Sequence, residues 1–87
     1  MKPVLMFTMA SCPYCNKATR YMEELMKETP KYKDIPFKVI DETLDPDTAE
    51  RYDYYFVPTY YVDDEKVHEG AASKEDIHRV FEKAEEE

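Results

Sequence analysis

The chain lacks the features that mark secreted scaffolds and membrane proteins. Its 87 residues include only two cysteines, which are too few for the several disulfides that staple a small secreted domain. No apolar run approaches the about 20 residues that a helix needs to cross a bilayer. We therefore expect neither a disulfide-stapled secreted protein nor a membrane protein.

Positive charge is also scarce. Lys and Arg together number 12 against 20 Asp and Glu, which gives a formal net charge of -8. Proteins that bind phosphate groups need clustered Lys and Arg. The charge balance therefore argues against nucleic acid and anionic membranes as partners.

The length and the start of the chain suggest a small intracellular protein. A chain of 87 residues has enough surface to bury for one modest core. The first residues run straight into an apolar segment at Val4, so a basic region, an apolar stretch and a cleavage site do not fit before it. We expect one domain over residues 1–87, monomeric and cytoplasmic.

Both cysteines lie in one tetrad, Cys12-Pro13-Tyr14-Cys15, between an apolar run and an amphipathic segment. Two thiols at this spacing can close a disulfide and open it again, and the attacking species is a thiolate. Pro13 fits the first turn of a helix, which places Cys12 where free N–H groups favour an anion. We expect Cys12 to attack a disulfide and Cys15 to resolve the mixed disulfide.

Other uses of a cysteine pair compete with this interpretation. A structural zinc site needs about four ligands, and the two histidines, His68 and His78, lie on different expected elements. A structural disulfide closing so short a loop would constrain the unfolded chain very little. Unreactive core thiols are the third alternative, but Pro13 and the helix start predict a surface turn.

Hydrophobic periodicity predicts an alternating order of strands and helices. The order is β-α-β-α-β-β-α, with strands near 3–8, 36–41, 59–62 and 66–68 and helices near 13–28, 46–52 and from Ser73 onward. A strand, a helix and a strand in succession imply a parallel pair with a right-handed crossover. Acidic residues 63–65 form the turn of the expected hairpin.

The segment Phe7-Thr8-Met9-Ala10-Ser11-Cys12-Pro13-Tyr14-Cys15 resembles the active site of glutaredoxins. The segments at 46–52, 57–59 and 70–75 resemble the thioredoxin pattern more closely. The resemblance covers nearly the whole chain and implies an α/β thioredoxin fold, in which a four-stranded mixed sheet carries helices on both faces. It also implies an enzyme, a thiol-disulfide oxidoreductase.

The resemblance assigns further site residues around the cysteine pair. It implies that the Val57-Pro58 bond is cis, although prolines in strand-rich segments are usually edge residues or strand starts. It implies that Val57, Pro58 and Thr59 bind substrate through the backbone, together with Pro13 and Tyr14. Lys17, near the helix start, is a candidate to stabilise the Cys12 thiolate, whereas most lysines on helices are simply solvated.

The chain departs from glutathione-binding glutaredoxins at two positions. Those proteins usually carry Lys or Arg where Met9 stands, and a Gly-Gly pair where this chain has Glu69-Gly70. Both changes disfavour the anion glutathione. Gly70 and Ser73 remain the candidate glutathione contacts, but Ser73 also suits a helix cap.

An aromatic run near Pro58 has two interpretations: it either packs the sheet or forms a protein-docking surface. At strand spacing, neighbouring side chains point to opposite faces. Only one of Tyr60 and Tyr61 can therefore join a given core layer. The run consists of Tyr52, Tyr54, Tyr55, Phe56, Tyr60 and Tyr61.

These observations predict a dithiol enzyme that reduces protein disulfides and serves cell redox homeostasis. No tightly bound cofactor or metal is expected. The electron donor would be glutathione or a flavoprotein reductase that uses NADPH. Compared with thioredoxins, the chain lacks a tryptophan before Cys12 and has Met6 near the usual buried aspartate. A redox sensor and an iron–sulfur or zinc carrier remain alternatives that use the same cysteine pair.

Overall fold

The computed structural model describes residues 1–86 of the domain predicted for residues 1–87. Its strands and helices follow the predicted order, with one additional 3₁₀-helix, η1. In chain order the elements are β1 (Val4–Thr8), α1 (Pro13–Glu28), η1 (Pro30–Asp34), β2 (Phe37–Asp41), α2 (Pro46–Glu50), β3 (Thr59–Val62), β4 (Glu65–Glu69) and α3 (Lys74–Glu85).

The strands form one mixed sheet in the order β2-β1-β3-β4. β1 pairs parallel to β2 and antiparallel to β3, and β3 pairs antiparallel to β4. Asp63 and Asp64 turn the β3–β4 hairpin with φ values of 51° and 67°, the positive values that match the strand twist in tight hairpins. The predicted four-stranded mixed sheet is confirmed.

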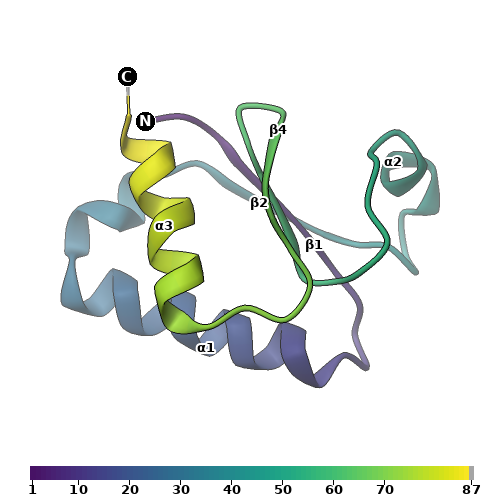
Figure 1. Cartoon of the computed structure of the whole chain (residues 1–87), viewed down its shortest axis with the longest axis horizontal. Coiled ribbons are helices and arrows are strands. Elements are labelled where there is room, and N and C mark those ends of the chain that lie inside the picture. Colours follow the sequence, from purple (N-terminus) through teal and green to yellow (C-terminus); the bar gives the residue numbers. More distant parts are fainter. Residues whose placement is uncertain (87) are drawn as a thin grey trace.

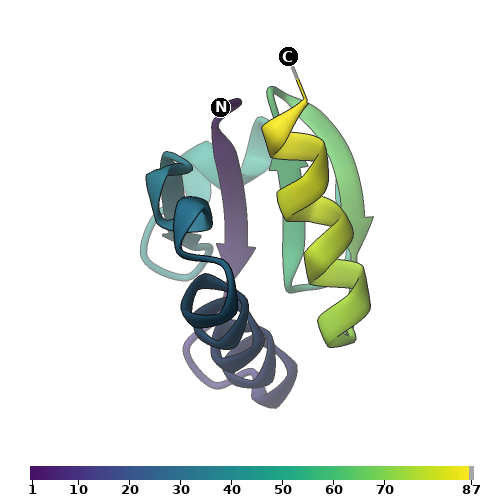
Figure 2. The same ribbon diagram turned by 90° about the vertical axis from the view of Figure 1, so that its left-hand side faces the viewer.

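Helices α1 and α3 cover one face of the sheet, and α2 lies on the other (Figure 1, Figure 2). The main core lies between the sheet and the apolar stripes of the two long helices. Those stripes are Ala18, Met22 and Leu25 on α1 and Ile77, Val80, Phe81 and Ala84 on α3, all buried. The start of the chain lies next to the last turn of α3, since the Lys2 N–H donates to the Ala84 carbonyl over 2.8 Å.

Neighbouring tyrosines of β3 serve the two faces separately. Tyr60 is buried in the main core under α1 and α3. Tyr61 belongs to a smaller core with Phe7 and Ile40 on the opposite face. Both rings are buried because both faces of the sheet are covered, and their opposite directions confirm the period-two prediction.

Two elements differ from the sequence prediction. Thr29 ends α1 as expected, but Pro30 then opens η1, which places the buried Tyr32 ring 5.0 Å from Phe81. The second helix ends at Glu50 and not near residue 52. Tyr52 leaves the helix because its ring packs on the smaller core, a tertiary contact that local propensity does not encode.

None of the helices in residues 1–86 combines the length and apolar character that crossing a bilayer requires.

Candidate functional site

The cysteine pair lies at the start of α1, the helix that follows β1 in the chain. Cys12 is the N-cap of the helix, with extended backbone, and Pro13 is the first helical residue. The backbone N–H of Cys15 donates to the Sγ of Cys12 over 3.2 Å. One of the free N–H groups of the first turn is therefore directed at the sulfur predicted to attack, where it would stabilise a thiolate.

Both thiols are more buried than a surface turn predicts. Cys12 is 6% exposed and Cys15 is 2% exposed. The loop ahead of β3 covers Cys12, whose thiol donates to the Val57 carbonyl over 3.8 Å. Cys15 lies on the inward face of α1, on the same side as Ala18 and Met22. The local helix start was predicted correctly, but the covering loop comes from 45 residues further along the chain.

Burial changes the chemistry of the Cys15 thiol. Loss of contact with water raises the pKa of the Cys15 thiol, and its hydrogen bond with Cys12 raises it further. The uncharged form of Cys15 is thus favoured in the folded protein. A protonated thiol suits the resolving role, because that thiol has to react only after a mixed disulfide has formed beside it.

The proline predicted to lie beside the thiols does so. The Val57-Pro58 peptide bond is cis, as the family resemblance implied. The Pro58 carbonyl accepts a hydrogen bond from the Gly70 N–H over 2.8 Å. Thr59 is fully buried, and its hydroxyl donates to the Phe56 carbonyl. The carbonyl of Val57 is the part of this segment that reaches Cys12.

Other predicted site residues separate into exposed and structural ones. Tyr14 is 59% exposed beside the thiols. Lys17 is exposed on α1 and has no hydrogen bond or ion pair with Cys12 within residues 1–86. Ser73 caps α3: its hydroxyl accepts the Asp76 N–H over 3.1 Å, and the Asp76 carboxylate accepts the Ser73 N–H over 3.0 Å. That pairing is the capping box expected of Ser73.

Gly70 has a structural reason to be glycine. Its φ is +90°, a value that residues with a Cβ rarely adopt. A Cβ added there would meet only the Phe56 Cβ, at 3.7 Å, which is an ordinary contact. The backbone conformation, and not lack of space, therefore selects glycine and directs its N–H at Pro58.

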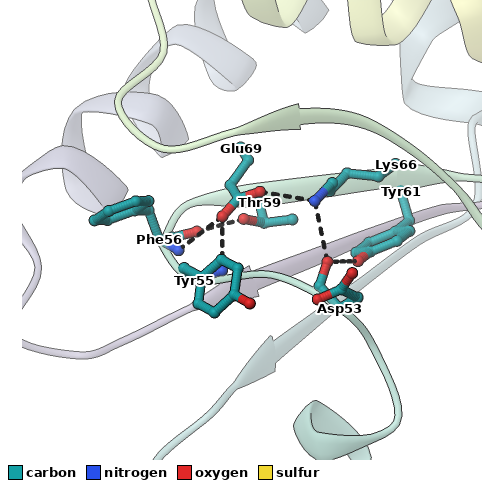
Figure 3. A network of polar contacts seen from close by, with 7 residues as sticks. All are labelled: Asp53, Tyr55, Phe56, Thr59, Tyr61, Lys66 and Glu69. Atoms are coloured by element: carbon teal, nitrogen blue, oxygen red, sulfur yellow. Dashed lines mark hydrogen bonds and ion pairs between the residues drawn. The ribbon is translucent and has the colours of Figure 1, made fainter.

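Glu69 has a structural role that the sequence does not indicate. As a charge it disfavours glutathione, but in the structure its carboxylate accepts the N–H groups of Tyr55 and Phe56 over 2.6 and 3.1 Å (Figure 3). Lys66 pairs with the same carboxylate over 2.8 Å. No local motif signals the two backbone bonds, because Tyr55 and Phe56 lie 14 and 13 residues before Glu69.

The aromatic run separates into packed rings and exposed rings. Tyr52 and Tyr54 pack against Phe7, with ring centroids 5.0 and 4.8 Å away. Tyr55 and Phe56 are 85% and 67% exposed. The first pair therefore completes the smaller core, and the second pair leaves apolar surface next to the cis-proline.

No group of three or more His, Cys, Asp or Glu in the described part of the chain is arranged to hold a metal ion.

The β-α-β-α-β-β-α architecture, with a cysteine pair at a helix start beside a cis-proline, defines a dithiol protein of the thioredoxin fold. A family model described as "Thioredoxin domain" matches residues 4–82. The chain belongs to this family. Among curated proteins no match is found.

Solved thioredoxins share the fold at low sequence identity. The oxidised thioredoxin of Plasmodium falciparum superposes with a TM-score of 0.70 at 20% identity, covering 92% of this chain and 77% of that one. Fasciola hepatica thioredoxin gives 0.70 at 20% identity, with 94% and 79% covered. Thioredoxin 1 of Thermosipho africanus gives 0.61 at 18% identity, with 97% and 99% covered. At these identities the likeness establishes the fold.

Proposed function

We propose that this protein is a thiol-disulfide oxidoreductase that reduces disulfide bonds in other proteins. The observation that carries the proposal is the Cys15 N–H directed at the Cys12 sulfur over 3.2 Å, with the Val57 carbonyl of the cis-proline segment 3.8 Å from the same sulfur. The membership in the thioredoxin domain family supports the same reaction class.

In the first step the Cys12 thiolate attacks one sulfur of the substrate disulfide. A bond forms between Cys12 and that sulfur, and the substrate bond breaks, so that the other substrate sulfur leaves as a thiolate and takes a proton from water. The Val57 carbonyl, 3.8 Å from the Cys12 sulfur, would orient an extended substrate segment at this point.

In the second step Cys15 loses its proton and attacks the Cys12 sulfur of the mixed disulfide. The Cys12–Cys15 disulfide forms, and the remaining substrate sulfur leaves as a thiolate and is protonated. The substrate has then gained two electrons and two protons, and the protein has lost the same. Burial favours the protonated form of Cys15, and the Cys15 N–H is directed at the Cys12 sulfur, so attack by Cys12 comes first.

Glutathione or an NADPH-dependent flavoprotein reductase would restore the dithiol. Met9 offers no positive charge to the glutathione carboxylates, and Ser73 is occupied as a helix cap. Both observations favour protein disulfides over small glutathione adducts as substrates. A cytoplasmic role in redox homeostasis fits this chemistry, since thiols are kept reduced in that compartment.

A coupled turnover assay tests the proposal. Insulin serves as the disulfide substrate, and NADPH oxidation is followed with glutathione plus glutathione reductase in one series and thioredoxin reductase in the other. We expect turnover in at least one series and none with Cys12→Ser. A Cys12→Ser protein with full activity, or a wild-type protein inactive in both series and in direct reaction with insulin, would contradict the proposal.

A further inference from the structure

The segment between α2 and β3 is irregular, yet its backbone is held at almost every residue. The Asp53 carbonyl accepts hydrogen bonds from the Tyr61 hydroxyl over 2.8 Å and from Lys66 Nζ over 3.1 Å. The Tyr55 and Phe56 N–H groups bind the Glu69 carboxylate. We call residues 53–58 the presenting loop, because it carries the exposed rings and ends at the cis-proline.

Two consecutive residues at the end of β4 bind the presenting loop. The side chain of Glu69 binds the loop N–H groups ahead of the cis bond, and the backbone N–H of Gly70 binds the Pro58 carbonyl after it. Glu69 also links the loop to Lys66, and through Lys66 to Asp53 (Figure 3). One carboxylate therefore connects three points of the loop.

The Glu69 carboxylate is well suited to remain an acceptor. The hydrogen bond from Lys66 and the two backbone N–H donors lower the pKa of its carboxyl to about 2. It is thus ionised throughout the neutral range, and hydrogen bonds to a charged acceptor are stronger than neutral ones.

The loop so held leaves apolar surface exposed next to the reacting sulfur. The rings of Tyr55 and Phe56 are mostly exposed, while the following residue, Val57, contacts Cys12 through its carbonyl. Aromatic side chains of this kind supply much of the contact energy when a polypeptide binds. A rigid loop lowers the ordering cost of such binding.

We propose that Glu69 is a positioning residue for substrate binding: it fixes the presenting loop so that Tyr55, Phe56 and the Val57 carbonyl receive a polypeptide that carries the disulfide. This inference rests on the proposed reductase function. It assigns to Glu69 a task in recognising protein disulfides and none in the bond exchange itself.

If Glu69 positions the loop, its substitution should affect polypeptide disulfides and not small disulfides. A polypeptide disulfide uses the loop, whereas a small disulfide such as 2-hydroxyethyl disulfide needs only the Cys12 sulfur. Pre-reduced protein is mixed with excess insulin or excess 2-hydroxyethyl disulfide, and formation of the Cys12–Cys15 disulfide is followed by mass spectrometry. For Glu69→Gln we expect the rate constant with insulin to fall about tenfold, the effect of weakening charge-assisted hydrogen bonds, and that with the small disulfide to stay unchanged.

Glu65→Gln is the matched control. Glu65 begins the same strand and is exposed, so its substitution removes the same charge without touching the loop. We expect this variant to react like the wild type with both disulfides. Equal losses for the two disulfides in Glu69→Gln, or no loss with insulin, would overturn the inference.

Amide hydrogen exchange tests whether Glu69 holds the presenting loop, without relying on enzyme activity. In Glu69→Gln the N–H groups of Tyr55 and Phe56 should exchange with solvent faster than in the wild type, while those of β1 should not change, as followed by NMR. Unchanged exchange at both loop residues would overturn the inference even if insulin reduction were impaired. A wild-type protein that reacts with neither disulfide would instead contradict the reductase function.

Discussion

The backbone N–H of Cys15 donates to the sulfur of Cys12 over 3.2 Å, so the residue assigned to resolve the mixed disulfide also supports the attacking sulfur. That support comes from the main chain and not from the Cys15 thiol. The two roles of Cys15 can therefore be separated by substitution.

Cys15→Ser should retain attack and lose release. The variant keeps the backbone N–H that faces Cys12, so Cys12 should still form a mixed disulfide, which then accumulates because no second thiol resolves it. Non-reducing electrophoresis and mass spectrometry after reaction with insulin should show the covalent complex. Its absence in Cys15→Ser, or its presence in Cys12→Ser, would contradict the assigned order of attack.

Release of the reduced substrate should accelerate as the pH rises. Burial is the largest cause that raises the pKa of the Cys15 thiol, so the thiolate fraction of Cys15 keeps increasing beyond the range near 8.5 where an ordinary cysteine ionises. A mixed disulfide between Cys12 and a small thiol-containing ligand is formed first. The rate at which Cys15 resolves it is then measured by rapid quench. A rate that levels off well below pH 8 would contradict this prediction.

The folded state should lose stability in alkaline solution. Burial, with the charge of nearby Cys15 as a second cause, raises the pKa of Tyr60 above its ordinary value near 10. Above that pH the unfolded chain releases the Tyr60 proton and the folded chain does not, so the free energy of unfolding falls as pH rises. In Tyr60→Phe this dependence should be weaker between about pH 10 and 11, measured by urea denaturation. An equal slope in both proteins would refute it.

Phe81 should be a principal contributor to stability. Its ring is fully buried and lies 5.0 Å from Tyr32 and 5.2 Å from Phe37. Removing a large buried ring leaves a cavity, so Phe81→Ala should lower the free energy of unfolding by about 3–5 kcal/mol. Leu44, which is exposed, provides the control: Leu44→Ala should change it by at most about 0.5 kcal/mol. Comparable changes in the two variants, measured by urea denaturation, would contradict the assignment of the core.

Much of the fold is predictable because its signals are local. The apolar residues of α1 follow one another at intervals of a few residues, and so do those of α3. The residues of the Ser73 cap are equally close in the sequence. The predicted β3–β4 hairpin follows from the acidic turn at 63–65 in the same way. Elements that depend on distant contacts were predicted less well: η1 and the end of α2 are fixed by Tyr32 and Tyr52 packing against remote rings.

The candidate site shows the same division. The tetrad at residues 12–15 predicts the helix start and the order of the two thiols from neighbouring residues alone. The extent to which Cys12 is covered was not predictable in this way, because Val57 approaches it from 45 residues further along the chain.

The sequence by itself determined the chemistry: a cysteine pair at a helix N-terminus, a proline expected beside it, and the order of elements that brings both to one end of the sheet. The tertiary structure decided which groups surround the pair. Glu69 acts on Tyr55 and Phe56 only because β4 returns next to β3 and brings a carboxylate to backbone N–H groups 13 and 14 residues earlier. Such a contact depends on how the strands assemble, and no spacing within one element encodes it.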